Sequence, residues 1–250
     1  MKKNFFFIIW GDPKFYQTLI FLSQYFSEKN YEITIFCKKP EIEQDIIGEI
    51  NFGKNTKIRF YPLNIRFLPG IINLIVFSLF CFFQFLILKP EKIIFFNKHS
   101  LLSLGLIRIF KKNKDKFIYH NFDFDEPANL KNFKERILTK LEFFFSKFAD
   151  FLVFPSIKRA NFFQSITKIE KLKFFELRNC FPKKFTPIKS NFFKEFLDRN
   201  NISDKKIVCC LGSIGSAHHL NEIIDSAKYM NKNIVLIIFL LILSRQYWKK

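Results

Sequence analysis

Short apolar runs alternate with amphipathic stretches along the first 178 residues, and this alternation predicts the fold. The apolar runs are rich in Phe, Ile and Val, which favour strands, and most are too short for buried helices. Predicted strands cover 4–10, 31–37, 56–63, 91–97, 115–121, 150–156 and 171–177. Predicted helices cover 14–30, 71–88, 101–110, about 130–149, and 157–166. Continuously apolar strands separated by helices are typical of a parallel sheet covered on both faces, so we expect an α/β, Rossmann-like domain.

A polar, basic stretch that contains two prolines interrupts the alternation, which then restarts. The restart predicts a strand at 206–213, a helix at 217–230 and a strand at 233–239. A complete second doubly wound domain would need roughly a hundred more residues. The sequence therefore predicts an acceptor-side domain over 1–178, a hinge or linker over 179–204, and an incomplete second α/β domain over 205–250.

The stretch 71–88 carries no charge and is long enough to span a membrane. Basic residues flank it on both sides, so the charge asymmetry that orients a span is missing. It also lies between the third and fourth predicted strands, where a parallel sheet needs a crossover helix. We therefore expect a crossover helix with an unusually apolar surface and a narrow polar stripe at Asn73 and Gln84. A spanning helix stays open as the alternative.

The helix predicted over about 130–149 combines lysines with apolar residues at helical spacing. Those apolar residues are Phe133, Ile137, Leu141, Phe144, Phe145 and Phe148. We expect an amphipathic helix that packs them on the sheet. The alternative is a basic, aromatic face that lies on anionic lipid.

The formal net charge is +19 at pH 7, and the lysines are spread along the whole chain. No zinc-finger spacing, Arg-rich arm or RNA-recognition motif is present, so specific nucleic-acid binding is not expected. An anionic membrane surface or a phosphorylated substrate fits the charge better. Abundant Lys and Phe also indicate an A/T-rich gene, which weakens charge as a functional signal.

Other sequence features exclude several protein classes and favour a cytoplasmic protein. The five cysteines form no CxxC pair, so we expect reduced, buried thiols and neither a metal site nor a disulfide framework. The apolar run at 4–10 is short for a signal peptide, and no cleavage site follows it. No GxGxxG follows the first strand, which disfavours a dinucleotide oxidoreductase.

Four segments resemble glycosyltransferase family 4 proteins, which have the GT-B fold of two Rossmann-like domains. In chain order they are KPEKIIFFNKHS (89–100), ADFLVFPSIKRANFF (149–163), ELRNCFP (176–182) and KKIVCCLGSIGSAHHLNEIIDSAKYM (205–230). The resemblance covers about residues 1–240 and implies transfer of a sugar from a nucleotide-sugar donor, without a metal or other cofactor. It implies a cell-envelope glycan or a lipid-linked molecule as the acceptor.

The resemblance also directs attention to the loop after the fifth strand, where family members often carry a His-Asp pair. Asp123 fits the aspartate, but Phe122 stands where the histidine would be. His120 and His99 are therefore the other candidate catalytic residues. A histidine can orient or deprotonate an acceptor hydroxyl because its pKa lies near neutrality. Each of these side chains can instead be an ordinary loop or capping residue.

Candidate phosphate-binding residues lie after the first strand of each domain. A glycine at such a turn lets backbone N–H groups approach an anion at the next helix's N-terminus, although a plain tight turn has the same sequence. The candidates are Gly11, Asp12, Gly212, Ser213, Gly215 and His218. Ser213 and His218 stand near positions where the family often has arginine and lysine.

The chain ends before the paired glutamates that grip the donor in this family. We therefore expect a truncated or frameshifted transferase, which can be inactive by itself, at the cytoplasmic face of the plasma membrane. One alternative is a non-catalytic domain that binds the acceptor or the membrane, or a partner subunit of a split transferase whose C-terminal domain is a separate chain. A second alternative is a small membrane protein with spans at 71–88 and 234–243.

Overall fold

The computed structural model describes residues 4–38, 50–61, 70–110, 116–122, 133–170, 173–178, 191–213 and 220–241. The chain divides into two compact units, Met1–Lys183 and Lys184–Lys250, and each is described by itself. The predicted linker 179–204 stays a prediction, because residues 179–190 lie outside the described part.

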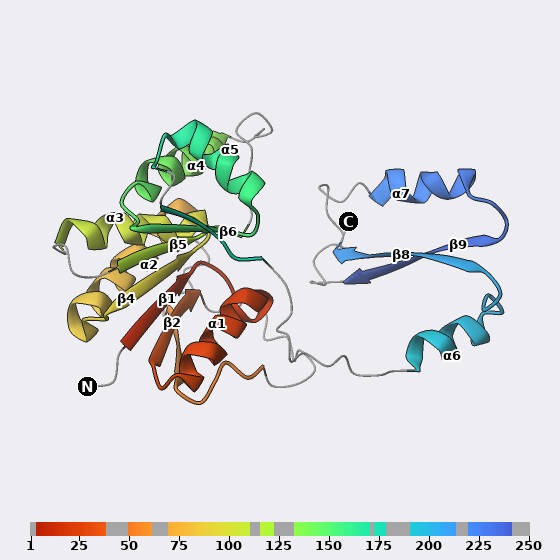
Figure 1. The fold of residues 1–250 in the computed structure, drawn as a ribbon, viewed down its shortest axis with the longest axis horizontal. Helices are drawn as coiled ribbons and strands as arrows, with labels where there is room; N and C mark the ends of the chain where they lie inside the picture. Colours follow the sequence, from red (N-terminus) through yellow and green to blue (C-terminus); the bar gives the residue numbers. More distant parts are fainter. Residues whose placement is uncertain are drawn as a thin grey trace. The chain divides into compact units, whose positions relative to one another are not determined.

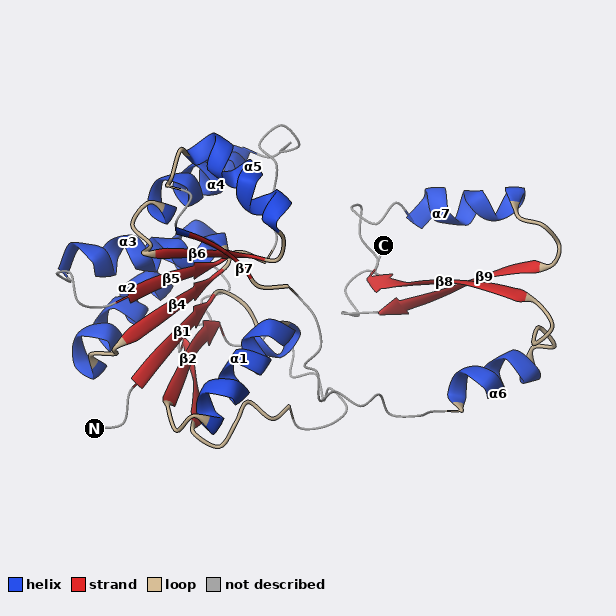
Figure 2. Cartoon of the chain, in the orientation of Figure 1, coloured by secondary structure: helices blue, strands red, loops and turns tan. Residues whose placement is uncertain are grey.

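Unit 1 contains a parallel sheet in the order β3-β2-β1-β4-β5-β6-β7, which confirms the predicted α/β, Rossmann-like fold (Figures 1 and 2). Every described strand pair in this sheet is parallel. The strand order reverses between β1 and β4, which places the topological switch point there. The strands are β1 Asn4–Ile9, β2 Glu32–Lys38, β3 Thr56–Tyr61, β4 Lys92–Phe96, β5 Lys116–His120, β6 Phe151–Phe154 and β7 Phe174–Glu176.

Helices cover both faces of this sheet (Figure 2). Side chains of α1 join Phe5, Phe7 and Ile9 in one buried cluster, and those of α2, α3 and α5 join Phe6 and Ile8 in the other. Successive strand residues point to opposite faces, so a strand with helices on both sides is apolar at every position. The helices are α1 Gln17–Glu28, α2 Gly70–Leu88, α3 Leu101–Phe110, α4 Phe133–Ser146 and α5 Ile157–Thr167, with 3₁₀ turns η1 Pro13–Phe15 and η2 Lys98–Ser100.

Helix α2 is the predicted crossover helix between β3 and β4, which belong to the same sheet. One side of it is buried, through Leu74, Phe77, Ser78, Cys81, Phe82 and Phe85. Within the described residues it alone is long and apolar enough to cross a membrane, with a mean hydropathy of 2.6 over its most apolar window. The two residues of the expected polar stripe have separate roles: Gln84 accepts a hydrogen bond from Arg59 (2.9 Å), and Asn73 lies at a cavity described below.

Unit 2 holds a two-stranded parallel sheet, β8 Lys206–Ser213 and β9 Ile234–Leu241, joined through α7 Leu220–Ser226 and the 3₁₀ turn η6 Ala227–Tyr229. Helix α6, Phe192–Arg199, precedes it. The alternative of a spanning helix at 234–243 is therefore wrong over β9, which pairs with β8 along its length. Cys37 and Cys81 are buried thiols as expected, but Cys209 is exposed on β8. Cys180 lies outside the described residues.

Helices α3 and α4 pack closely at Gly105, which leaves no space for a side chain. A Cβ built there would lie 2.6 Å from Cδ1 of Phe145. We expect Gly105→Ala to lower the free energy of unfolding by about 1–2 kcal/mol, because the steric cost exceeds the helix propensity gained. Urea denaturation of the two proteins measures the difference.

The double variant Gly105→Ala with Phe145→Leu should recover part of that loss, since the smaller side chain makes room for the methyl group. Phe145→Leu alone is the control. Equal losses for Gly105→Ala with and without Phe145→Leu would show that the phenyl ring is not the obstacle.

Candidate functional site

The carboxyl ends of β1, β2, β4 and β5 meet at one edge of the unit 1 sheet, because the strands are parallel neighbours. In open α/β sheets, ligands bind outside this edge, at the point where the strand order reverses. Here that point lies between β1 and β4. Trp10 follows β1, Lys38 ends β2, and His99 lies in the 3₁₀ turn after β4.

A cavity of about 160 Å³ lies at this edge, and we call it the switch-point pocket. Its walls come from the ends of β1 and β2, the turn after β4, and the first turns of α2 and α4. The lining residues are Trp10, Lys38, Gly70, Ile71, Asn73, Leu74, His99, Lys134 and Leu138. Their side chains supply two ammonium groups, one imidazole, one amide and the indole N–H of Trp10. The described lining holds no carboxylate, so its charge suits an anionic ligand.

Neighbouring contacts hold the basic groups of the switch-point pocket in place. The Lys38 ammonium lies 5.6 Å from the ring centroid of Trp10, within range of a cation–π interaction. A Cβ on Gly70 would come within 3.0 Å of Nζ of Lys134, so the glycine lets this lysine approach the start of α2. Beside His99, Lys98 pairs with Glu135 of α4 at 2.6 Å. That ion pair ties the turn after β4 to the helix that carries Lys134.

Of the predicted catalytic residues, His99 is the one that lines the switch-point pocket. His120 ends β5 and is buried, with its ring centroid 4.5 Å from that of Phe122 and 5.5 Å from that of Phe96. In the described part of the chain, neither of its ring nitrogens has a hydrogen-bond partner. Burial lowers its pKa to about 4, so the ring is neutral at pH 7. Asp123 lies outside the described residues.

Gly11 and Asp12 form the turn between β1 and η1. The Asp12 side chain caps η1 by accepting a hydrogen bond from the backbone N–H of Lys14 (3.0 Å). A Cβ on Gly11 would lie 3.2 Å from Oη of Tyr16. In this arrangement the Asp12 carboxylate already accepts a hydrogen bond from the Lys14 N–H, which a bound phosphate would otherwise receive. Burial, with a smaller contribution from the Asp12 charge, raises the pKa of the Cys37 thiol to about 12.

The predicted donor-side residues lie in unit 2. Gly212 and Ser213 are the last two residues of β8, paired in register with Leu240 and Leu241 of β9. Gly215 and His218 lie outside the described residues, so the phosphate-binding loop stays a prediction.

A buried polar cluster at the end of β5 was missed by the sequence analysis. Glu142 of α4 is 1% exposed, and its Oε1 accepts hydrogen bonds from Oη of Tyr119 (2.6 Å) and Nδ2 of Asn121 (2.7 Å). The same amide nitrogen lies 2.9 Å from the Tyr119 oxygen, to which it donates. Hydrogen bonds to a buried carboxylate strongly favour one orientation of the helix that carries it. The one available signal was Glu142 itself, a charged residue within a run of apolar helix positions.

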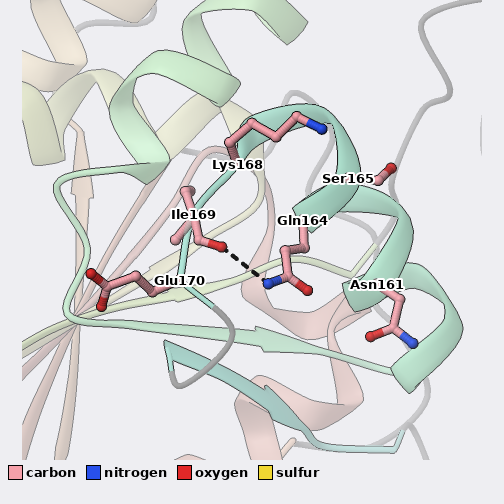
Figure 3. Close-up of a pocket in the computed structure, with 6 residues that line it drawn as sticks. All are labelled: Asn161, Gln164, Ser165, Lys168, Ile169 and Glu170. Carbon is pink, nitrogen blue, oxygen red and sulfur yellow. Dashed lines mark hydrogen bonds between the residues drawn. The ribbon is translucent and has the colours of Figure 1, made fainter.

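A larger hollow of about 480 Å³ lies at the end of α5, lined by Asn161, Gln164, Ser165, Lys168, Ile169 and Glu170 (Figure 3). Nε2 of Gln164 donates to the carbonyl of Ile169 across it (3.2 Å). The hollow lies at the C-terminal end of a helix that follows β6, and therefore toward the amino ends of the strands. Its place opposite the switch point makes it a weaker candidate. Across the described residues, no group of three or more His, Cys, Asp or Glu side chains could hold a metal ion.

Comparison with solved structures identifies the fold as GT-B. HepE from Anabaena, in complex with UDP and glucose, superposes with a TM-score of 0.67 at 10% identity, over 99% of this chain and 64% of its own. Sucrose-phosphate synthase from Thermosynechococcus elongatus superposes with a TM-score of 0.66 at 10% identity, over 95% of this chain and 62% of its own. The UDP-N-acetylglucosamine 2-epimerase from Rickettsia bellii superposes with a TM-score of 0.57 at 11% identity, over 96% of this chain and 62% of its own.

These likenesses show the fold alone, because their sequence identities are low. The chain spans about 64% of the length of the first structures that it matches. No protein-family model matches the sequence, and no curated protein matches it significantly.

The buried His120 predicts a pH dependence of stability. Its pKa falls from the usual 6.5 to about 4 on folding, so the unfolded chain takes up the proton first as the pH falls. The contribution of the neutral His120 to the free energy of unfolding is fully present above pH 6.5. It is lost progressively toward pH 4, by about 3 kcal/mol in total. Urea unfolding at several pH values in this window measures the slope.

In His120→Phe this contribution to the slope should vanish, since phenylalanine cannot titrate and suits the aromatic surroundings. The carboxyl groups titrate alike in both proteins, so the difference between the two curves isolates the histidine. Parallel curves for the two proteins would contradict a buried, neutral His120.

Proposed function

We propose that this chain takes part in the transfer of a sugar from a nucleoside diphosphate sugar to an acceptor hydroxyl, and that unit 1 holds the acceptor. The fold supports this, since GT-B proteins of known structure include HepE with bound UDP and glucose and the lipopolysaccharide outer core galactosyltransferase WaaB. The observation that carries the proposal is the cationic switch-point pocket with His99 in its wall. We assign the acceptor's reacting end to this pocket.

The reaction forms a bond between the acceptor oxygen and the anomeric carbon of the sugar. The bond from that carbon to the diphosphate breaks, and the nucleoside diphosphate leaves with the electron pair. The acceptor hydroxyl loses its proton, and the His99 imidazole is placed to receive it as a general base. Lys38 and Lys134 stabilise negative charge on the acceptor side, such as a phosphate near the hydroxyl. The donor is a substrate, and the proposal includes no metal or cofactor.

We assign the donor diphosphate to the loop after β8, through Gly212, Ser213, Gly215 and His218. A glycine loop before a helix offers backbone N–H groups to phosphate oxygens. The acceptor in this proposal is a cell-envelope glycan or a lipid-linked molecule at the cytoplasmic face of the plasma membrane. A separate subunit that supplies a C-terminal donor domain is a further proposed partner.

Acceptor binding without catalysis is the second candidate function. All the described residues that line the switch-point pocket belong to unit 1, so unit 1 offers a site at which an acceptor can bind without transfer.

The test uses the purified chain, a panel of radiolabelled UDP-sugars and a short-chain prenyl phosphate as acceptor. We expect label to enter the organic phase. His99→Gln should lower the transfer rate by about 10²–10⁴-fold, because the general base is lost. Lys134→Met should lower it by a smaller factor, and UDP affinity by calorimetry should stay within about twofold for both variants, since they lie on the acceptor side.

Lys54→Met is the matched control, because Lys54 is exposed in the turn before β3 and lies outside the switch-point pocket. Acceptor binding without turnover would support the second candidate function. Conversion of the donor sugar to its epimer, without transfer, would identify the chain as an epimerase instead. If neither a UDP-sugar nor the acceptor binds, the proposal is wrong.

A further inference from the structure

Helices α2, α3 and α4 lie side by side on one face of the unit 1 sheet, since α2 packs on α3 and α3 on α4. Their sides away from the sheet expose many large apolar side chains, and we call this surface the outer helical face. Its members are Ile72, Ile75, Leu79, Phe83, Leu86 and Ile87 on α2, Ile109 and Phe110 at the end of α3, and Phe133, Phe144 and Phe148 along α4 and just after it.

The α2 part of the outer helical face is a continuous apolar stripe. Ile72, Ile75, Leu79, Phe83 and Leu86 recur every three or four residues, so they align on one side of the helix. The other side of α2 is buried against the sheet. A surface helix of a soluble domain normally carries polar residues on its outer side. On α2 the outer side is apolar as well as the buried one, and Ile87 beside the stripe is 70% exposed.

Helix α4 corrects the expectation that its aromatic residues pack on the sheet. Its buried residues are Leu138, Thr139, Glu142 and Ser146. Phe133 is 77% exposed, and Phe144 and Phe148 are also exposed. The hydrogen bonds of Glu142 to the end of β5 hold its side of the helix inward, and Phe133, Phe144 and Phe148 lie on the exposed side. Phe145 does pack against the core, as expected. Exposed apolar surface of this extent marks an interaction site.

Within the described residues of these three helices, exposed cations accompany the apolar residues, and each acidic side chain is either paired or buried. Arg136, Lys140 and Lys147 are exposed between the phenylalanines of α4, and Lys89 is exposed at the end of α2. Helices α2 and α3 contain no acidic residue. In α4, Glu135 pairs with Lys98 and Glu142 is buried. The outer helical face is therefore both apolar and positive.

We propose that the outer helical face docks on the surface of an anionic phospholipid bilayer. Its apolar side chains would enter the boundary between headgroups and acyl chains, and its cations would contact lipid phosphates. Helix α2 lies in the plane of the surface and does not span it, because the strands before and after it, β3 and β4, belong to one sheet. This attachment goes beyond the proposed function and stands without it.

The charge argues for a lipid and against a second copy of the chain. In a symmetric dimer the same surface would face itself, and the cations between the phenylalanines of α4 would repel their copies. An anionic bilayer offers phosphates to these cations and apolar chains to the rings. Phe133 also precedes Lys134 of the switch-point pocket, so an acceptor at the bilayer surface would lie near this pocket.

The test is co-sedimentation of the full chain with vesicles of phosphatidylcholine, with and without phosphatidylglycerol. We expect strong binding to the anionic vesicles, and weaker binding as salt is added. The double variant Phe83→Ser with Ile87→Ser should lower the partition coefficient by about tenfold or more, because it removes two inserted side chains. Lys140→Glu with Lys147→Glu should cause a similar loss, confined to anionic vesicles.

The matched controls lie on α1 and just after it, and α1 covers the opposite face of the sheet. Tyr25→Ser removes an exposed aromatic side chain there, and Lys29→Glu makes the same kind of charge change; both should bind vesicles as the parent chain does. Every substituted residue is exposed, and an unchanged thermal midpoint confirms folding. The proposal is overturned if the α2 and α4 variants sediment with vesicles like the controls. It is also overturned if light scattering shows a dimer that the Phe83 variant abolishes while vesicle binding persists.

Discussion

Strand β1 pairs with β2 on one side and with β4 on the other, and its side chains are buried on both faces of the sheet. Because both of its faces must be covered, α1 packs on one side of the sheet and the layer formed by α2, α3 and α4 on the other. Because β4 lies beside β1, the strand order reverses between them. That reversal opens the sheet edge at which Trp10, Lys38 and His99 meet.

The buried carboxylate of Glu142 links this core to the surface of the unit. Its hydrogen bonds with Tyr119 and Asn121 set which side of α4 faces the sheet. This orientation of α4 about its own axis places Leu138 and Lys134 at the switch-point pocket and leaves Phe133 and Phe144 exposed. One buried polar contact therefore helps to shape both the proposed acceptor pocket and the proposed membrane surface. Burying a carboxylate is costly, and the two hydrogen bonds that Oε1 of Glu142 accepts offset part of that cost.

Much of the fold could be read from the sequence, because buried parallel strands are apolar at every position and their helices follow a different period. The candidate site could be read only in part. His99 follows the β4 strand, and it lies in the pocket as a residue after a parallel strand often does. Asp12 also follows a strand, yet its carboxylate caps the turn. His120 is the last residue of β5 itself, and the alternation of faces turns it inward against Phe96 and Phe122.

The sequence by itself determined the order of strands and helices and the α/β class, since both depend on local periodicity and on burial along short segments. Tertiary structure alone decided which loops converge, because residues as distant as Trp10 and Lys134 share a cavity only once β1 and β4 are neighbours. It also decided which side of α4 faces inward. The spacing of apolar residues in α4 favoured an orientation of the helix that buries its phenylalanines. The hydrogen bonds of the buried Glu142 carboxylate oppose that orientation.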